Sequence, residues 1–135
     1  MRATTVGTAA RKATVLIVED DPSLRSTYRT ALAFAGYSVI AVEDGVDALR
    51  HLEADTLEAV VLDLGLPRLH GRDVYREMRA DPRTRAIPIV IVTGSDPSSL
   101  DTTEFDCLLR KPFDPDELVS AVDACVRQAL RKQRI

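Results

Sequence analysis

The 135-residue sequence has no long apolar run, no surplus of positive charge and few cysteines. No apolar stretch approaches the roughly 20 residues that a helix needs to cross a bilayer, so we expect no membrane span. The formal net charge is -3, whereas non-specific binding of nucleic acid depends on an excess of Lys and Arg facing phosphates. We therefore expect no direct contact with nucleic acid.

Cysteine and histidine are scarce, which limits the redox and metal chemistry that the sequence predicts. Cys107 and Cys125 do not form a CxxC pair, and the N-terminus shows no secretory signal. We expect both as reduced thiols, packed in the core of a cytoplasmic protein. His51 and His70 have no second His or Cys at metal-ligand spacing, so we expect neither to bind a metal.

The remaining composition is typical of one globular domain. Hydrophobic residues make up 45% of the chain and charged residues 29%, and a chain of this length can bury its own core. Residues 1–12 contain Thr, Ala and Arg but no acid, and we predict a disordered tail there. We predict a single domain over residues 13–131 and a basic tail over residues 132–135.

Short apolar segments alternate with helical patterns along the chain. The buried strands predicted from these segments are residues 15–18, 38–42, 57–62 and 87–92, with a weaker fifth strand at 107–109. Apolar residues at helical spacing predict helices that begin near Pro22, Gly45, Asp73 and Pro115, and Asp21 is expected to cap the first. Alternating strands and helices imply right-handed crossovers. We therefore predict an α/β fold, a three-layer sandwich around a parallel sheet.

Charged or hydroxyl residues stand at the ends of four predicted strands. Glu19 and Asp20 follow the first strand, Asp63 the third, Thr93 the fourth and Lys111 the fifth. Ligands of open α/β sheets bind outside the carboxyl ends of the strands, so we expect these side chains to converge. Three clustered carboxylates require a cation, and Mg²⁺ prefers such oxygen ligands. A lysine, a hydroxyl and a nucleophilic carboxylate complete the groups that phosphoryl transfer uses.

Four motifs, in this order along the chain, resemble those of one protein family. They are Leu16-Ile17-Val18-Glu19-Asp20-Asp21, Leu62-Asp63-Leu64-Gly65-Leu66-Pro67 with Gly71, Val92-Thr93-Gly94, and Lys111-Pro112-Phe113. In these motifs the chain resembles the receiver domain of two-component response regulators, over about residues 13–130. The resemblance implies a flavodoxin-like sheet of five parallel strands in the order 2-1-3-4-5, and a role in phosphorelay signal transduction.

The resemblance also assigns roles in phosphoryl transfer. It implies that a histidine kinase or a phosphotransfer protein phosphorylates Asp63. Lys111 would contact the acyl phosphate, and Thr93 would donate a hydrogen bond to a phosphoryl oxygen. The peptide bond between Lys111 and Pro112 is expected to be cis.

For a Mg²⁺ ion, the resemblance implies direct ligation by Asp20 and Asp63. Glu19 would act through water, and the backbone carbonyl of Gly65 would be a further ligand. Three acids close together predict that at least one carboxyl pKa is raised unless a cation compensates.

Two features depart from the family pattern. Leu108 stands three residues before Lys111, where the family usually carries a Tyr or Phe that moves inward on switching. The segment 94–106 contains only two apolar residues, Leu100 and Phe105, and its Ser, Asp and Thr residues favour turns. We therefore predict a fourth helix that is short or disordered. Because this region forms the family's common output surface, we expect a monomer or a weak dimer.

The sequence leaves three classes of function open. The first is a receiver whose phosphorylation changes its affinity for a downstream protein that the sequence does not identify. The second is a pseudo-receiver, a protein-interaction module that phosphorylation does not switch; Leu108 favours it, and the intact acids count against it. The third, a phosphohydrolase, would need a second acid where Gly65 stands, so we expect no turnover of external substrates. A stand-alone receiver and a segment of a larger protein both fit.

Overall fold

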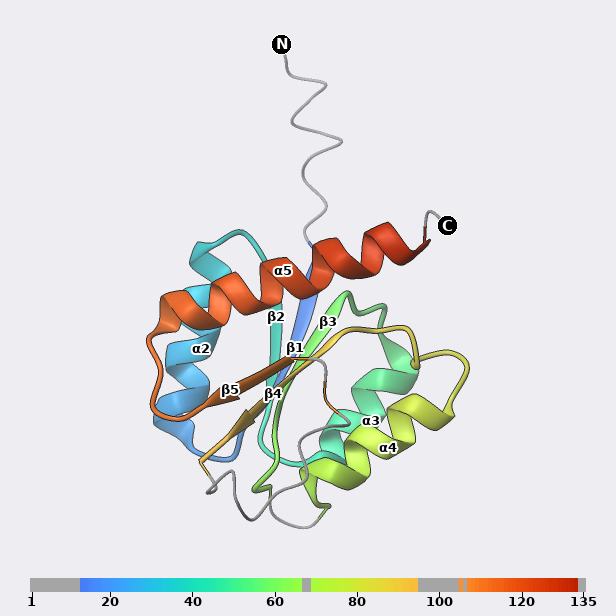
Figure 1. The fold of residues 1–135 in the computed structure, drawn as a ribbon. Helices are drawn as coiled ribbons and strands as arrows, with labels where there is room; N and C mark the ends of the chain where they lie inside the picture. The colour runs from blue at the N-terminus through green and yellow to red at the C-terminus, as the bar shows by residue number, and fades with distance from the viewer. Residues whose placement is uncertain (1–12, 67–68, 95–104, 106, 134–135) are drawn as a thin grey trace.

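The structure is a computed structural model that describes residues 13–66, 69–94, 105 and 107–133. The strands are β1 (Thr14–Val18), β2 (Ser38–Val42), β3 (Ala59–Asp63), β4 (Ile89–Thr93) and β5 (Cys107–Arg110), and the helices are α2 (Pro22–Phe34), α3 (Gly45–Ala54), α4 (Gly71–Ala80) and α5 (Pro115–Gln133). All strand pairs are parallel, in the order β2-β1-β3-β4-β5 (Figure 1). The predicted α/β class and strand order are confirmed.

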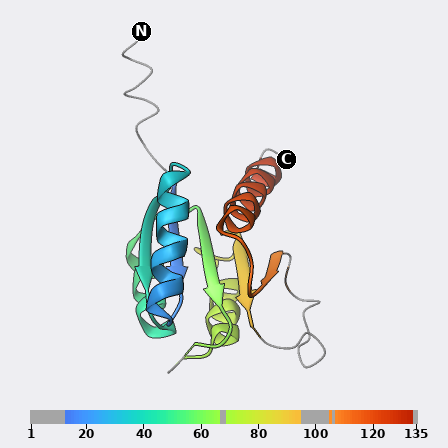
Figure 2. The ribbon, with the colours of Figure 1, turned by 90° about the vertical axis from the view of Figure 1, so that its left-hand side faces the viewer.

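Helices cover both faces of the sheet, which gives the three predicted layers (Figures 1 and 2). Alternate residues of a strand point to opposite faces, so each strand contributes to two separate cores. Val15 and Ile17 pack with α2 and α5, whereas Leu16 and Val18 pack with α3 and α4. Every residue of β3 and β4 is buried, as expected for parallel strands covered on both sides.

The start of α2 fixes the short connection that carries the first two acids. The carboxylate of Asp21 accepts hydrogen bonds from the backbone N–H groups of Ser23 and Leu24, and Pro22 lies in the first turn. The prediction that Asp21 caps this helix is therefore confirmed. Only residues 19–21 separate β1 from α2, so Glu19 and Asp20 are held at the end of the strand.

The cysteines correct one of our predictions. Cys107 and Cys125 form a disulfide, so the expectation of reduced thiols is wrong. Cys107 begins β5 and Cys125 lies in α5, 18 residues further along the chain. Both belong to the core between α5 and the sheet, and the fold therefore brings together two thiols that no spacing pattern relates.

The described residues contain four helices. The last of them, α5, has 19 residues and is the helix predicted to begin near Pro115. It continues through Gln133, two residues past the predicted end of the domain. The prediction of a short or disordered helix concerned the segment 94–106, of which residues 95–104 and 106 lie outside the described residues. The predicted tail over residues 1–12 also lies outside them. Within the described ranges, no helix combines the length and the apolar character that a membrane span requires.

Candidate functional site

The carboxyl ends of four strands meet at one edge of the sheet and bring the predicted residues together. Glu19 and Asp20 directly follow β1, Asp63 ends β3, and Thr93 ends β4. Lys111 directly follows β5. Since β2 and β3 lie on opposite sides of β1, the acids stand where the strand order reverses, which is the usual ligand site of this architecture.

Three carboxylates form a cluster at this edge. Glu19, Asp20 and Asp63 each offer an oxygen, and these oxygens lie within 4.8 Å of one another. Glu19 is 1% exposed and Asp63 is 5% exposed, whereas Asp20 is open to solvent. Burial raises the pKa of Glu19 to about 7, and the negative charge of Asp63 adds to this rise. One carboxyl pKa in the cluster is therefore raised, as predicted, but burial is the main cause and the neighbouring acid Asp63 adds less.

Lys111 supplies the positive charge within the cluster. Its Nζ lies 2.8 Å from Oε1 of Glu19 and 3.4 Å from Oδ2 of Asp63. Burial alone would lower the pKa of Lys111, but the two carboxylates outweigh this effect and raise it, so the ammonium stays protonated. The peptide bond between Lys111 and Pro112 is cis, as predicted.

One lysine does not satisfy all of the carboxylate oxygens. Oε1 of Glu19 is buried, and its contact with Lys111 lacks the geometry of a hydrogen bond, so within the described residues this oxygen accepts none. The backbone N–H of Gly65 donates to Oδ1 of Asp63 at 3.0 Å, which orients that carboxylate. A hard divalent cation such as Mg²⁺ binds oxygen ligands that have a free lone pair. The residues present therefore fit this ion.

Thr93 lies beside the lysine in the sheet. It is buried at the end of β4 and pairs in register with Arg110, and its backbone carbonyl accepts a hydrogen bond of 2.9 Å from the N–H of Lys111. This contact ties the hydroxyl-bearing residue and the lysine to neighbouring strand ends. Both therefore reach the edge that carries the acids.

Two residues of α2 support the site, and our sequence analysis missed their roles. Nη1 of Arg25 donates to the backbone carbonyl of Glu19 at 2.9 Å and to that of Asp20 at 3.4 Å. The ring of Tyr28 stacks on Phe113 with centroids 5.4 Å apart. Burial raises the pKa of Tyr28 to about 12. Their signal in the sequence is a spacing of three residues in the helix that follows the acids, which places them on one helical face.

Gly71 allows α4 to begin directly against the end of β3. A Cβ atom at this position would lie 2.2 Å from the backbone oxygen of Asp63 and 2.6 Å from Cα of Leu64. Its N–H donates to the carbonyl of Leu64 at 3.3 Å. Only glycine permits this approach, which holds the backbone of Asp63 in place.

Leu108 occupies the position where the family pattern has an aromatic ring. Its side chain is half-buried and packs against the core shared by α3 and α4. Phe105 also reaches this core, where its ring makes an edge contact with Tyr75 at a centroid distance of 4.8 Å. The apolar contact between this part of the chain and the core is therefore made by Leu108 and Phe105, without an aromatic residue at position 108.

An open parallel sheet with acids, a hydroxyl residue and a lysine at its carboxyl edge defines the class of flavodoxin-like signalling domains. The chain belongs to the response regulator receiver domain family, whose sequence pattern matches residues 15–123. It is therefore a signalling domain of the two-component type.

Response regulators of mycobacteria are among the relatives of this chain in sequence. The chain is 36% identical over 118 residues to the response regulator MprA of Mycobacterium avium, a match that covers 84% of this chain and 51% of that protein. The match to MprA of Mycobacterium tuberculosis is also 36% identical and covers 84% of this chain and 50% of that protein. The chain thus spans about half the length of these relatives.

Solved structures show the same architecture. The signal receiver domain of a signal transduction histidine kinase from Syntrophus aciditrophicus has a TM-score of 0.78 and 28% identity, and the match covers 86% of this chain and 91% of that one. The receiver domain of the sensor histidine kinase PA1611 from Pseudomonas aeruginosa PAO1 has a TM-score of 0.77 and 29% identity, with coverage of 87% and 99%. That structure holds a magnesium ion coordinated in its active site cleft.

Proposed function

We propose that this chain accepts a phosphoryl group on Asp63 in a Mg²⁺-dependent reaction and thereby changes its affinity for a downstream protein. The observation that carries the proposal is the position of Lys111, whose Nζ lies within 3.4 Å of Asp63 and 2.8 Å of Glu19. An ammonium at this distance offsets the negative charge of a phosphoryl group placed on Asp63, and a carboxylate oxygen is the nucleophile that forms an acyl phosphate.

The proposed reaction uses few groups of the chain. An oxygen of Asp63 attacks the phosphorus, a new P–O bond forms, and the bond to the donor breaks. Lys111 neutralises negative charge on the transferred group, and the hydroxyl of Thr93 donates a hydrogen bond to one of its oxygens. The N–H of Gly65 already holds the other oxygen of Asp63, so the nucleophile is oriented before the donor arrives.

Glu19, Asp20 and Asp63 are the residues proposed to hold Mg²⁺, together with the backbone carbonyl of Gly65. The exposure of Asp20 supports direct ligation at the open side of the cluster, and the burial of Glu19 supports a role behind it. When bound, Mg²⁺ supplies positive charge that offsets the charge on phosphoryl oxygens.

A labelling experiment tests this proposal. The purified chain is incubated with a small acyl-phosphate donor, and phosphate incorporation is followed with Mg²⁺ and with Mg²⁺ removed by a chelator. We expect incorporation with Mg²⁺ and loss of most of it on chelation. The pseudo-receiver alternative predicts no incorporation in either condition, so a chain that stays unlabelled would refute the proposal in favour of that alternative.

Catalysis of an external reaction is not part of the proposal. Gly65 stands two residues after Asp63, where a phosphohydrolase would carry its acid-base carboxylate. The chain would catalyse only its own phosphorylation and dephosphorylation. Release of phosphate from external phosphate esters at a rate above the turnover of the labelled chain would contradict this.

The proposed donor is a histidine kinase or a phosphotransfer protein, and the proposed location is the cytoplasm. We further propose a monomer or a weak dimer that acts by protein contact, without direct contact with nucleic acid or membrane. Disulfides in the cytoplasm are mostly transient or redox-sensing. In that compartment we would therefore expect the Cys107–Cys125 bond to form and break with the redox state.

A further inference from the structure

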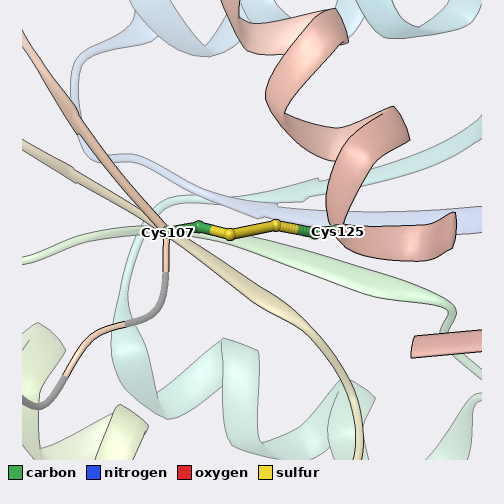
Figure 3. The surroundings of a disulfide bond; sticks show 2 residues. All are labelled: Cys107 and Cys125. Carbon is green, nitrogen blue, oxygen red and sulfur yellow. A yellow bond between two sulfur atoms is a disulfide. The ribbon is translucent and has the colours of Figure 1, made fainter. Parts of the chain in front are cut away.

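A pocket at the amino ends of β4 and β5, on the edge opposite the acid cluster, has the disulfide in its wall. The pocket has a volume of about 380 Å³ and lies between the end of α4, the start of β4 and the second half of α5. Cys107 and Cys125 both line it, and Figure 3 shows the bond joining the β5 segment to α5. Cys107 is the more exposed of the two, since Cys125 is only 4% exposed.

The charged side chains around this pocket are all positive. Arg79, Arg85 and Lys132 line it, and no acidic residue is among the described residues of its wall. Nη1 of Arg79 is fixed by the carbonyls of Arg85 at 2.6 Å and Ile87 at 3.0 Å. Arg85 and Lys132 are exposed. The pocket therefore attracts anions, although the chain as a whole carries a net charge of -3.

The rest of the wall contains apolar residues, among them Ile87, Pro88 and Ala129, and one neutral polar residue, Gln128. A pocket of this volume admits a small molecule but not a protein segment of any length. The ligand class that suits it is therefore small, anionic and able to react with a disulfide.

We infer that this pocket is a thiol–disulfide exchange site for small anionic thiols. The cations of the wall draw the anion in, and they favour the thiolate over the thiol, which is the form that attacks a disulfide. The inference does not depend on phosphorylation of Asp63. It assigns a second, independent chemistry to the opposite edge of the domain.

The exchange has two balanced steps. The thiolate of the first thiol molecule attacks Sγ of Cys107, a mixed disulfide forms, and Cys125 leaves as a thiolate that takes up a proton. The thiolate of a second molecule attacks the mixed disulfide, which releases Cys107 as a thiol and the two reagent molecules as their own disulfide. Two thiols are oxidised and one protein disulfide is reduced. The product has no covalent link between α5 and the strand that leads to Lys111.

The test compares two thiols of similar size, the anionic 2-mercaptoethanesulfonate and the neutral 2-mercaptoethanol. Each rate of reduction of the folded protein is divided by the rate of the same thiol with a small uncharged disulfide. Alkylation and mass measurement follow the appearance of the two protein thiols. We expect the corrected rate to favour the anionic thiol by about threefold to tenfold at low salt, and this preference to shrink as salt screens the charges.

The charge requirement is tested with Arg85→Gln combined with Lys132→Gln. We expect this double variant to lose most of the preference while the neutral thiol reacts at an unchanged rate, which also shows that folding and access are intact. Arg29→Gln combined with Arg50→Gln removes the same charge from exposed residues of α2 and α3 and should keep the preference. An equal corrected rate for both thiols, an equal loss in both double variants, or two free thiols before any reductant is added would overturn the inference.

Discussion

At the scale of single residues, the site depends on one lysine placed between two carboxylates that are almost removed from water. Lys111 lies within 3.4 Å of both Glu19 and Asp63, and it leaves Oε1 of Glu19 without a hydrogen bond among the described residues. The excess of negative charge makes the cluster incomplete on its own. An incomplete buried cluster of this kind favours a function in which a cation and a phosphoryl group are added later.

Gly71, at the start of α4, gives a second observation at the residue scale and a prediction. Gly71→Ala would place Cβ 2.2 Å from the backbone oxygen of Asp63, and backbone atoms cannot move away without shifting the strand end. We expect the free energy of unfolding in urea to fall by more than about 2 kcal/mol. Gly65→Ala is the matched control, because its Cβ would meet Asp63 at an ordinary 3.7 Å. Equal losses in the two variants would contradict this explanation.

The convergence of the candidate site residues at one edge of the sheet was predictable because strand ends can be recognised in the sequence. Apolar runs that stop at Glu19 and at Asp63 indicate where buried strands end, and the strand order then brings the acids together. The contribution of Arg25 was not predictable, because its contact is with backbone carbonyls that any sequence would offer. The disulfide escaped prediction because Cys107 and Cys125 meet only after α5 packs on the sheet.

At the scale of elements, α2 and α5 share one face of the sheet and are joined by a polar contact as well as by the core. The hydroxyl of Tyr37, just after α2, donates a hydrogen bond to the carboxylate of Asp123 in α5. Burial and this carboxylate raise the pKa of Tyr37 well above its usual value, so the phenol stays a donor at neutral pH. The contact links the segment that follows α2 to α5, the helix that follows Lys111.

Loss of this hydrogen bond gives a prediction for the pair of helices. We expect Tyr37→Phe to lower the free energy of unfolding by about 1 kcal/mol, since it removes one hydrogen bond and leaves a half-buried carboxylate without its donor. A double-mutant cycle with Asp123→Ala checks the cause. If the pair interacts as described, Asp123→Ala costs less in the Tyr37→Phe background than in the wild type, whereas simple additivity would contradict the contact.

At the scale of the whole molecule, the sheet separates two sites at opposite edges. The carboxyl edge carries the acids and Lys111, and the amino edge carries the basic pocket and the disulfide. Strand β5 runs between them, from Cys107 to the residue before Lys111. The class and topology of this fold followed from the alternation of apolar segments, whereas the pocket depends on side chains from three distant parts of the chain and had no signal in the sequence.

Binding of Mg²⁺ should change the stability of the whole domain. A ligand that binds only the folded state stabilises it by about 2.7 kcal/mol at a concentration 100 times its Kd, so we expect Tm to rise on addition of Mg²⁺. Asp20→Asn should remove most of this rise without harm to folding, because Asp20 is exposed. The same rise in wild type and variant would place the ion elsewhere.

The central claim is that Asp63 is the phosphoryl acceptor, and intact-mass measurement of the wild type and Asp63→Asn tests it most directly. Both proteins are incubated with the same small acyl-phosphate donor and Mg²⁺, after circular dichroism has shown that both are folded. The account predicts the mass of one added phosphoryl group on the wild type and none on the asparagine variant. Equal addition to both proteins would contradict it.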